Sequence, residues 1–140
     1  MAAGNWNEIL ESYRFPQKEY WGKDFIWMEK LINQILANRD LSILYPVTSH
    51  HRLIMYIGKS FEGIDVRPQI KIELSYEARE ELRDKFRFKL SLVTGREDED
   101  VFKEYVESIY CSLEKSLEVF DELFDNLKAI TANNSQIGTS

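Results

Sequence analysis

One strand-like segment carries the residues whose types and spacing come closest to a catalytic pattern. Asp65, Lys71 and Glu73 all have odd numbers, so they share one face of the strand predicted over residues 64–74. Strand carboxylates that hold a divalent metal beside a lysine would perform metal-dependent nuclease chemistry. Such sites normally include an acid-x-basic triplet, and here Gln69 stands where the second acid is needed. A nuclease-like enzyme therefore remains the alternative hypothesis.

The other reactive side chains form no recognisable catalytic or metal-binding group. His50 and His51 are the only histidines, and adjacent residues of an extended chain point to opposite sides. Cys111 is the only cysteine. A helix would place it on the outer side between Glu107 and Glu114, which should raise the thiol pKa and leave it inert. We expect no metal and no cofactor.

Residues 79–96 are the most basic segment and the candidate for nucleic-acid binding. They contain six lysines and arginines, with Phe86 and Phe88 interleaved. In a strand Arg87 and Lys89 face away from both phenylalanines, so the aromatic rings belong to the core and offer no stacking platform. We therefore expect that nucleic acid is not the partner. A weak nucleic-acid-binding domain is the alternative hypothesis for this segment.

Acidic residues are concentrated in one part of the sequence. The 140 residues include 24 acids and 18 bases, a net charge of -6, which argues against functions that rely on a generally basic surface. Residues 97–128 hold eleven acids and three lysines, a net of -8, and the first 96 residues hold thirteen acids and fifteen bases, a net of +2. The negative balance therefore belongs to the last predicted helix.

That helix is predicted because residues 97–130 contain no Gly or Pro and repeat apolar side chains in a heptad pattern. A helix over residues 99–129 would be about 46 Å long, whereas a globule of this size is about 37 Å across. An overhanging end would expose an apolar patch, which favours a protein partner or a homodimer. The predicted partner-binding residues are acids and apolar side chains of this segment: Glu107, Glu114, Glu118, Asp121, Glu122, Asp125, Phe120, Leu123, Phe124 and Leu127.

The elements that precede it follow from apolar periodicity. Two helices are expected, one capped by Asn5 and ending before Pro16, the other over residues 18–38. Strands are expected over residues 41–47, 53–57, 64–74 and 86–92. Residues 75–85 fit a short helix or an extended hairpin, and we favour the helix because no Gly, Pro or Asn is present for a tight turn.

This order predicts a single α+β domain over residues 1–130, with a mainly antiparallel sheet of about four strands and a flexible tail over residues 131–140. In general architecture it resembles secretion chaperones and toxin-neutralising immunity proteins, which implies a binding function. The lone cysteine, the absence of a signal peptide and the absence of a long apolar run favour a cytoplasmic protein without membrane contact. We therefore expect a non-enzymatic protein-binding or regulatory domain.

Overall fold

The computed structural model describes residues 3–14, 22–49, 52–60, 67–74, 85–94 and 102–138. Helices α1 (Trp6–Arg14) and α2 (Gly22–Asn38) come first. Five strands follow, β1 (Leu44–Ser49), β2 (Arg52–Ile57), β3 (Gln69–Leu74), β4 (Phe86–Thr94) and β5 (Phe102–Cys111). A short 3-10 turn, η3 (Leu113–Lys115), then leads into helix α3 (Ser116–Gly138).

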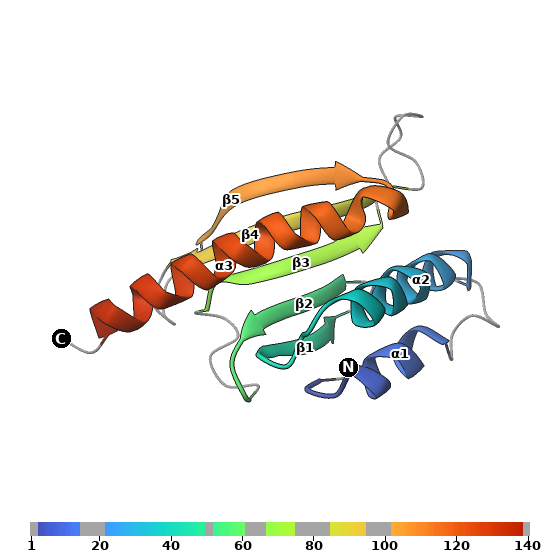
Figure 1. Cartoon of the computed structure of the whole chain (residues 1–140), viewed down its shortest axis with the longest axis horizontal. Helices are drawn as coiled ribbons and strands as arrows, with labels where there is room; N and C mark the ends of the chain where they lie inside the picture. Colours follow the sequence, from blue (N-terminus) through green and yellow to red (C-terminus); the bar gives the residue numbers. More distant parts are fainter. Residues whose placement is uncertain are drawn as a thin grey trace.

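The sheet has the order β1-β2-β3-β4-β5, and each strand is antiparallel to its neighbours (Figure 1). The prediction of an α+β fold with an antiparallel sheet is confirmed, with five strands instead of about four. The proposed helix or hairpin before β4 falls on residues 75–84, which lie outside the described residues.

The main correction concerns residues 102–111, which form β5 and not the first part of a long helix. Leu90 and Ser91 are adjacent on β4 but pair with Glu107 and Tyr105, so β5 carries one extra residue. Such a bulge shifts the two-residue alternation of a strand. Apolar residues on either side of it then stand three and four positions apart, and this spacing imitates a helix.

Helix α3 begins at Ser116, where its first turn is tied to α2. The Gln34 side-chain amide donates to the Leu113 carbonyl and to the Ser116 Oγ, both at 2.9 Å. The Ser116 hydroxyl donates to the same Leu113 carbonyl at 2.7 Å. With 23 residues α3 is about 34 Å long, well short of the expected 46 Å. It continues through residues 131–138, which we had expected in a flexible tail.

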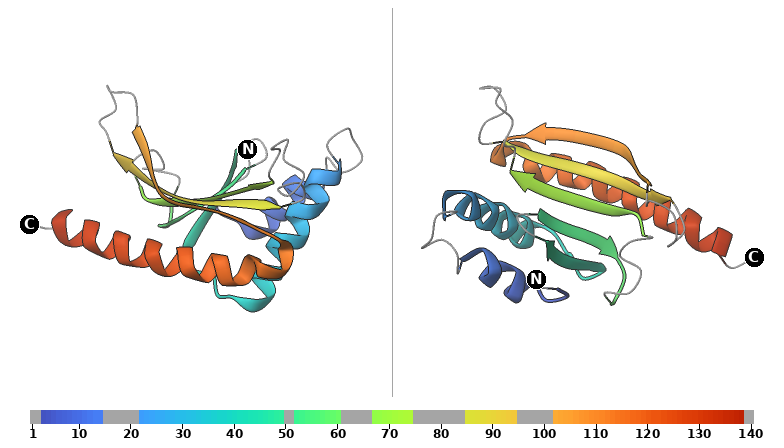
Figure 2. Two further views of the ribbon diagram at one scale, coloured as in Figure 1. Left: turned by 90° about the horizontal axis from the view of Figure 1, so that it is seen from above. Right: turned by 180° about the vertical axis from the view of Figure 1, so that it is seen from behind.

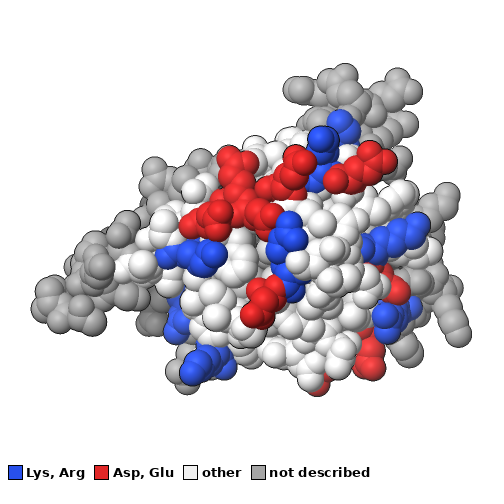
Figure 3. Space-filling view, in the orientation of Figure 1, with Lys and Arg blue, Asp and Glu red and all other residues white. Residues whose placement is uncertain are grey.

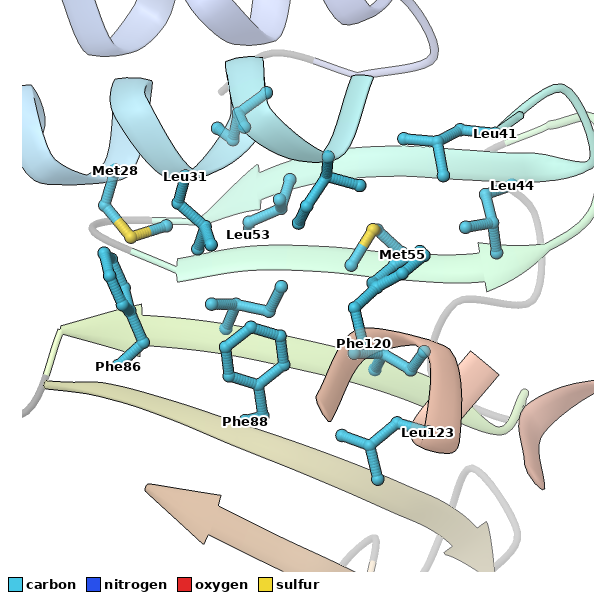
Figure 4. Close-up of a cluster of buried hydrophobic side chains, with 14 of the residues drawn as sticks. Met28, Leu31, Leu41, Leu44, Leu53, Met55, Phe86, Phe88, Phe120 and Leu123 are labelled. Carbon is cyan, nitrogen blue, oxygen red and sulfur yellow. The ribbon is translucent and has the colours of Figure 1, made fainter. Parts of the chain in front are cut away.

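Helices α2 and α3 lie on one face of the sheet, and α1 packs beside α2 (Figure 2). Strand residues on this face form cross-strand rows, for example Leu53 opposite Ile72 and Ile72 opposite Phe88. The helices cover these rows with buried apolar side chains (Figure 4): Met28, Leu31, Ile32, Ile35, Phe120, Leu123, Phe124 and Leu127. The apolar side of α3 from Phe120 to Leu127 is therefore part of the core, and these residues do not form the exposed patch that was expected.

The N-terminal segment closes part of the free edge of β1. Ala3 forms an antiparallel bridge with Val47, and the Gly4 amide donates to the Pro46 carbonyl at 2.7 Å. Gly4 has a φ of 79°, and a Cβ there would lie 2.9 Å from the Tyr45 ring. Only glycine suits this position, because other residues rarely adopt that φ and would collide with the ring.

The predicted start of the first helix is confirmed. The Asn5 Oδ1 accepts hydrogen bonds from the backbone amides of Asn7, at 2.8 Å, and Glu8, at 3.4 Å. Ile9, Leu10 and Tyr13 form the buried side of α1. An N-cap of this kind stabilises a helix by about 1 kcal/mol.

Replacing Phe120 with Ala should lower the free energy of unfolding by about 3–5 kcal/mol, because the ring has no exposed surface and its loss leaves a cavity. Urea unfolding monitored by circular dichroism measures the change. The exposed neighbour Glu122 provides the control, since Glu122→Gln should stay within about 0.5 kcal/mol of the wild type. An effect of Phe120→Ala as small as that of the control would contradict the packing of α3 on the sheet.

Candidate functional site

The exposed acids of the C-terminal region form a stripe along η3 and α3. We define the acidic stripe as Glu114, Glu118, Glu122 and Asp125, all of which are exposed. The last three residues are spaced at intervals of four and three positions, which places their side chains on one side of a helix. Figure 3 shows acidic side chains gathered on this face of the molecule.

The stripe is only part of the acidic segment identified in the sequence. Residues 97–111 hold six acids and one lysine, a net of -5, and residues 112–128 hold five acids and two lysines, a net of -3. Glu107 lies on β5, in register with Leu90, and not on α3. The expectation that a single helix carries the whole charge of -8 is therefore wrong, because the segment folds as a strand followed by a helix.

The apolar residues that we had grouped with these acids lie on the opposite side of α3. Phe120, Leu123 and Leu127 have no exposed surface, and Phe124 is 9% exposed. The Phe120 and Phe124 rings contact each other edge to face, with 5.4 Å between their centroids. The structure thus separates the predicted partner-binding set into an exposed acidic side and a buried apolar side.

Asp121 lies beside the stripe and forms an ion pair with Arg39, the residue that follows α2. Its Oδ1 accepts from the Arg39 Nε and its Oδ2 from an Arg39 terminal nitrogen, both at 2.6 Å. This fork-shaped pair lowers the pKa of Asp121, chiefly through the hydrogen bond from Arg39, and raises the pKa of Arg39. The pair ties α3 to the end of α2, so Asp121 has a structural role.

Two lysines lie near the ends of the stripe. The Lys128 Nζ is 3.3 Å from the Asp125 Oδ1, and the Lys115 Nζ is 4.0 Å from Glu118. Both are exposed helical pairs, which contribute little to stability. Among the described residues no ion pair involves Glu122, the acid between them. Glu122 is therefore an exposed carboxylate of the stripe that no described cation neutralises.

The nuclease hypothesis finds no geometric support on β3. Asp65 lies outside the described residues, and the Glu73 carboxylate is occupied by cations. Its Oε1 is 2.9 Å from the Lys89 Nζ and its Oε2 is 3.1 Å from the Arg52 Nε. Within the described ranges, no three His, Cys, Asp or Glu side chains are grouped so that they could hold a metal ion. His50 and His51 also fall outside these ranges.

The described residues of the basic segment are likewise buried or in contact with neighbouring strands. Phe86 and Phe88 are fully buried under the helices, as we had expected. The Arg87 Nε donates to the Ser108 Oγ at 3.2 Å, and its guanidinium lies 5.5 Å from the Tyr110 ring centroid. Arg79, Arg83 and Arg96 are outside the described residues.

Four polar residues are buried on the sheet face opposite the helices. Gln69 and Lys71 are each 2% exposed, Lys89 is 7% exposed and Ser91 has no exposed surface. We call these four residues the polar quartet. Gln69 is directly opposite Ser91, and Lys71 is directly opposite Lys89. The alternation of side chains along a strand predicts that these four residues share one face. It does not indicate whether that face is buried.

Aromatic residues near the N-terminus contribute to the core where the structure describes them. Tyr13 is 1% exposed, and Trp6 and Trp27 are partly buried against the main apolar cluster. The side chains of Phe15, Tyr20, Trp21 and Phe25 lie outside the described residues.

Comparison with protein-family models, with curated proteins and with solved structures finds no match for this chain. Among the described residues, no helix combines the length and the apolar character that crossing a bilayer requires. Inference about function therefore depends on the geometry of the chain itself.

Acidification should remove the contribution of the Arg39–Asp121 pair to stability. Because the folded pKa of Asp121 lies below its unfolded value of about 3.9, the contribution is complete above that value and is lost as the pH falls through the folded pKa. Asp121→Asn should therefore be less stable than the wild type at neutral pH, and the gap should narrow in strong acid. Urea titrations across this range measure the gap. Glu122→Gln serves as the control, and an equal narrowing in both variants would contradict the assignment to Asp121.

Cys111 should resist alkylation while the protein is folded. The residue ends β5 and is 6% exposed, and its burial raises the thiol pKa to about 11. The acids that we had expected to cause such a shift are not its cause. At pH values near 8 only about one thiol in a thousand is then ionised. Mass spectrometry after iodoacetamide treatment should show slow labelling in buffer and rapid labelling in urea; equal rates in both would contradict the burial of the thiol.

Proposed function

We propose that this chain is a non-enzymatic protein-binding or regulatory domain that docks a basic surface of a partner protein on the acidic stripe. The observation that carries the proposal is the exposure of Glu118 and Glu122 on the side of α3 that the core does not use. The core needs the apolar side of this helix, whereas the acidic side contributes nothing to packing. A surface of one charge sign attracts partners of the opposite sign and orients their approach.

The chemistry of the stripe suits lysine and arginine side chains. Carboxylates at successive helical turns lie about 5–6 Å apart, a spacing that basic residues on a partner helix or strand can follow. Charge-assisted hydrogen bonds to carboxylates are about twice as strong as neutral ones. The lysines of the stripe lie near its ends, so Glu122 is the natural centre of the contact.

A second copy of the chain is not the partner that we propose for this surface. The case for a homodimer depended on an overhanging helix with an exposed apolar side. That side is buried in the core, where Phe120, Leu123 and Leu127 have no exposed surface. Two acidic stripes would also repel each other, since like charges brought together at an interface cost free energy.

Binding of basic peptides tests the proposal. The purified protein is applied to an array of short peptides that differ in the number and spacing of lysine and arginine residues. We expect the double variant Glu118→Gln/Glu122→Gln to weaken the best interactions about tenfold, which corresponds to about 1.4 kcal/mol. The affinity of the wild type should also fall as salt is added.

The matched control is Glu8→Gln/Glu11→Gln, which removes the same net charge from exposed positions on α1. It should bind as the wild type does if the stripe is the docking surface. An equal loss in both double variants would mean that only the net charge matters. That result, or the absence of any peptide that binds at low salt, would overturn the proposal.

A further inference from the structure

The polar quartet combines hydrogen-bond donors in a way that a sheet surface seldom does. Lys71 and Lys89 are direct cross-strand partners, and Gln69 and Ser91 form the next pair on the same face. All four alternate along β3 and β4 with buried core residues such as Ile70 and Leu90, so they project away from α2 and α3. The quartet comprises two ammonium groups, a hydroxyl and a side-chain amide, which donates to the Arg67 carbonyl at 3.2 Å, and it contains no carboxylate.

Burying ammonium groups costs free energy unless hydrogen bonds and opposite charges compensate it. Lysine is among the residues least often buried, yet Lys71 and Lys89 are 2% and 7% exposed. Like charges that are directly opposite on neighbouring strands destabilise a sheet. The Lys89 Nζ lies 2.9 Å from the Glu73 Oε1, but Glu73 also serves Arg52. Each ammonium has three N–H donors and can serve several acceptors at once, so such a pair can also hold an anion.

The Ser91 hydroxyl provides an independent indication. It has no exposed surface, and within the described part of the chain its Oγ is the only fully buried side-chain oxygen or nitrogen without a hydrogen-bond partner. Native proteins satisfy most buried polar groups, because an unsatisfied one loses its hydration without compensation. The hydroxyl lies on the same side of β4 as Lys89 and opposite Gln69, where it could donate a hydrogen bond to an oxygen of a ligand.

We infer that the polar quartet binds an oxyanion, the carboxylate or phosphate group of a small ligand, through Lys71, Lys89, Ser91 and Gln69. The donors match an anion whose several oxygens can each accept a hydrogen bond. The neighbouring row of the same face includes Arg52, whose side chain is 50% exposed, and Glu73, whose side chain is 20% exposed. Solvent therefore reaches this face at the row next to Lys71 and Lys89.

Ligand-dependent stability tests the inference, independently of the proposed docking on α3. The thermal midpoint is measured with increasing phosphate, acetate or chloride at constant ionic strength. An anion that binds only the folded protein raises the midpoint by mass action. We expect phosphate or acetate to stabilise the wild type more than chloride does, and the more effective of the two identifies the ligand group.

Ser91→Ala is the decisive variant, because it removes an unpartnered hydroxyl and so should fold at least as well as the wild type. We expect it to weaken the apparent affinity for the stabilising anion about fivefold, the usual effect of losing one hydrogen bond. Lys71→Gln should abolish the stabilisation. The controls are Ser42→Ala, at an exposed position before β1, and Lys115→Gln, on η3, which should respond as the wild type does.

Two results would overturn the inference. One is a wild type that phosphate and acetate stabilise no more than chloride does. The other is a Ser91→Ala variant that keeps the full anion-dependent shift seen in Ser42→Ala. If Lys71→Gln does not fold, the comparison of the two serine variants still decides the outcome.

Discussion

The fold depends on the burial of the apolar side of α3 against the sheet. Phe120, Leu123 and Leu127 lose all contact with water on the face formed by β2, β3 and β4. Fully burying one such side chain contributes about 1.5–3 kcal/mol, so this single contact layer provides a large share of a stability that is typically about 5–15 kcal/mol. Gln34 of α2 and Arg39, which directly follows α2, hold the first turns of α3 in place over that face.

The same packing determines which surfaces remain for function. Because the apolar side of α3 faces the sheet, its acidic side must face solvent, and the exposed stripe follows from the amphipathic pattern of the helix. The opposite face of the sheet has two parts. Val47, Ile54 and Tyr56 form a small apolar cluster on β1 and β2, whereas β3 and β4 carry the buried polar quartet. The described part of the chain thus has two polar regions of distinct chemistry, one acidic and exposed, the other buried and rich in donors.

The sequence predicts the elements whose periodicity is uninterrupted. Helix α1 with its Asn5 cap, most of α2, and strands β2 and β4 lie close to their expected positions. Strand β5 was missed because its bulge changes a two-residue period into a helical one. Local pattern also could not reveal the Arg39–Asp121 pair, whose members are 82 positions apart, or the covered face of β3, since alternation separates polar from apolar residues without indicating burial. The exposure of Glu118 and Glu122 was predictable, because it needs only the correct helix.

The most direct test of the account is whether the apolar side of α3 is covered by its own sheet. In a sample that mixes isotope-labelled and unlabelled chains, filtered nuclear Overhauser spectra distinguish contacts within one chain from contacts between chains. We predict contacts from the Phe120 ring to buried sheet residues such as Met55 and Phe88 within the same chain. Contacts of Phe120 that appear only between chains would contradict the account, because the helix would then be covered by a second copy and not by its own sheet.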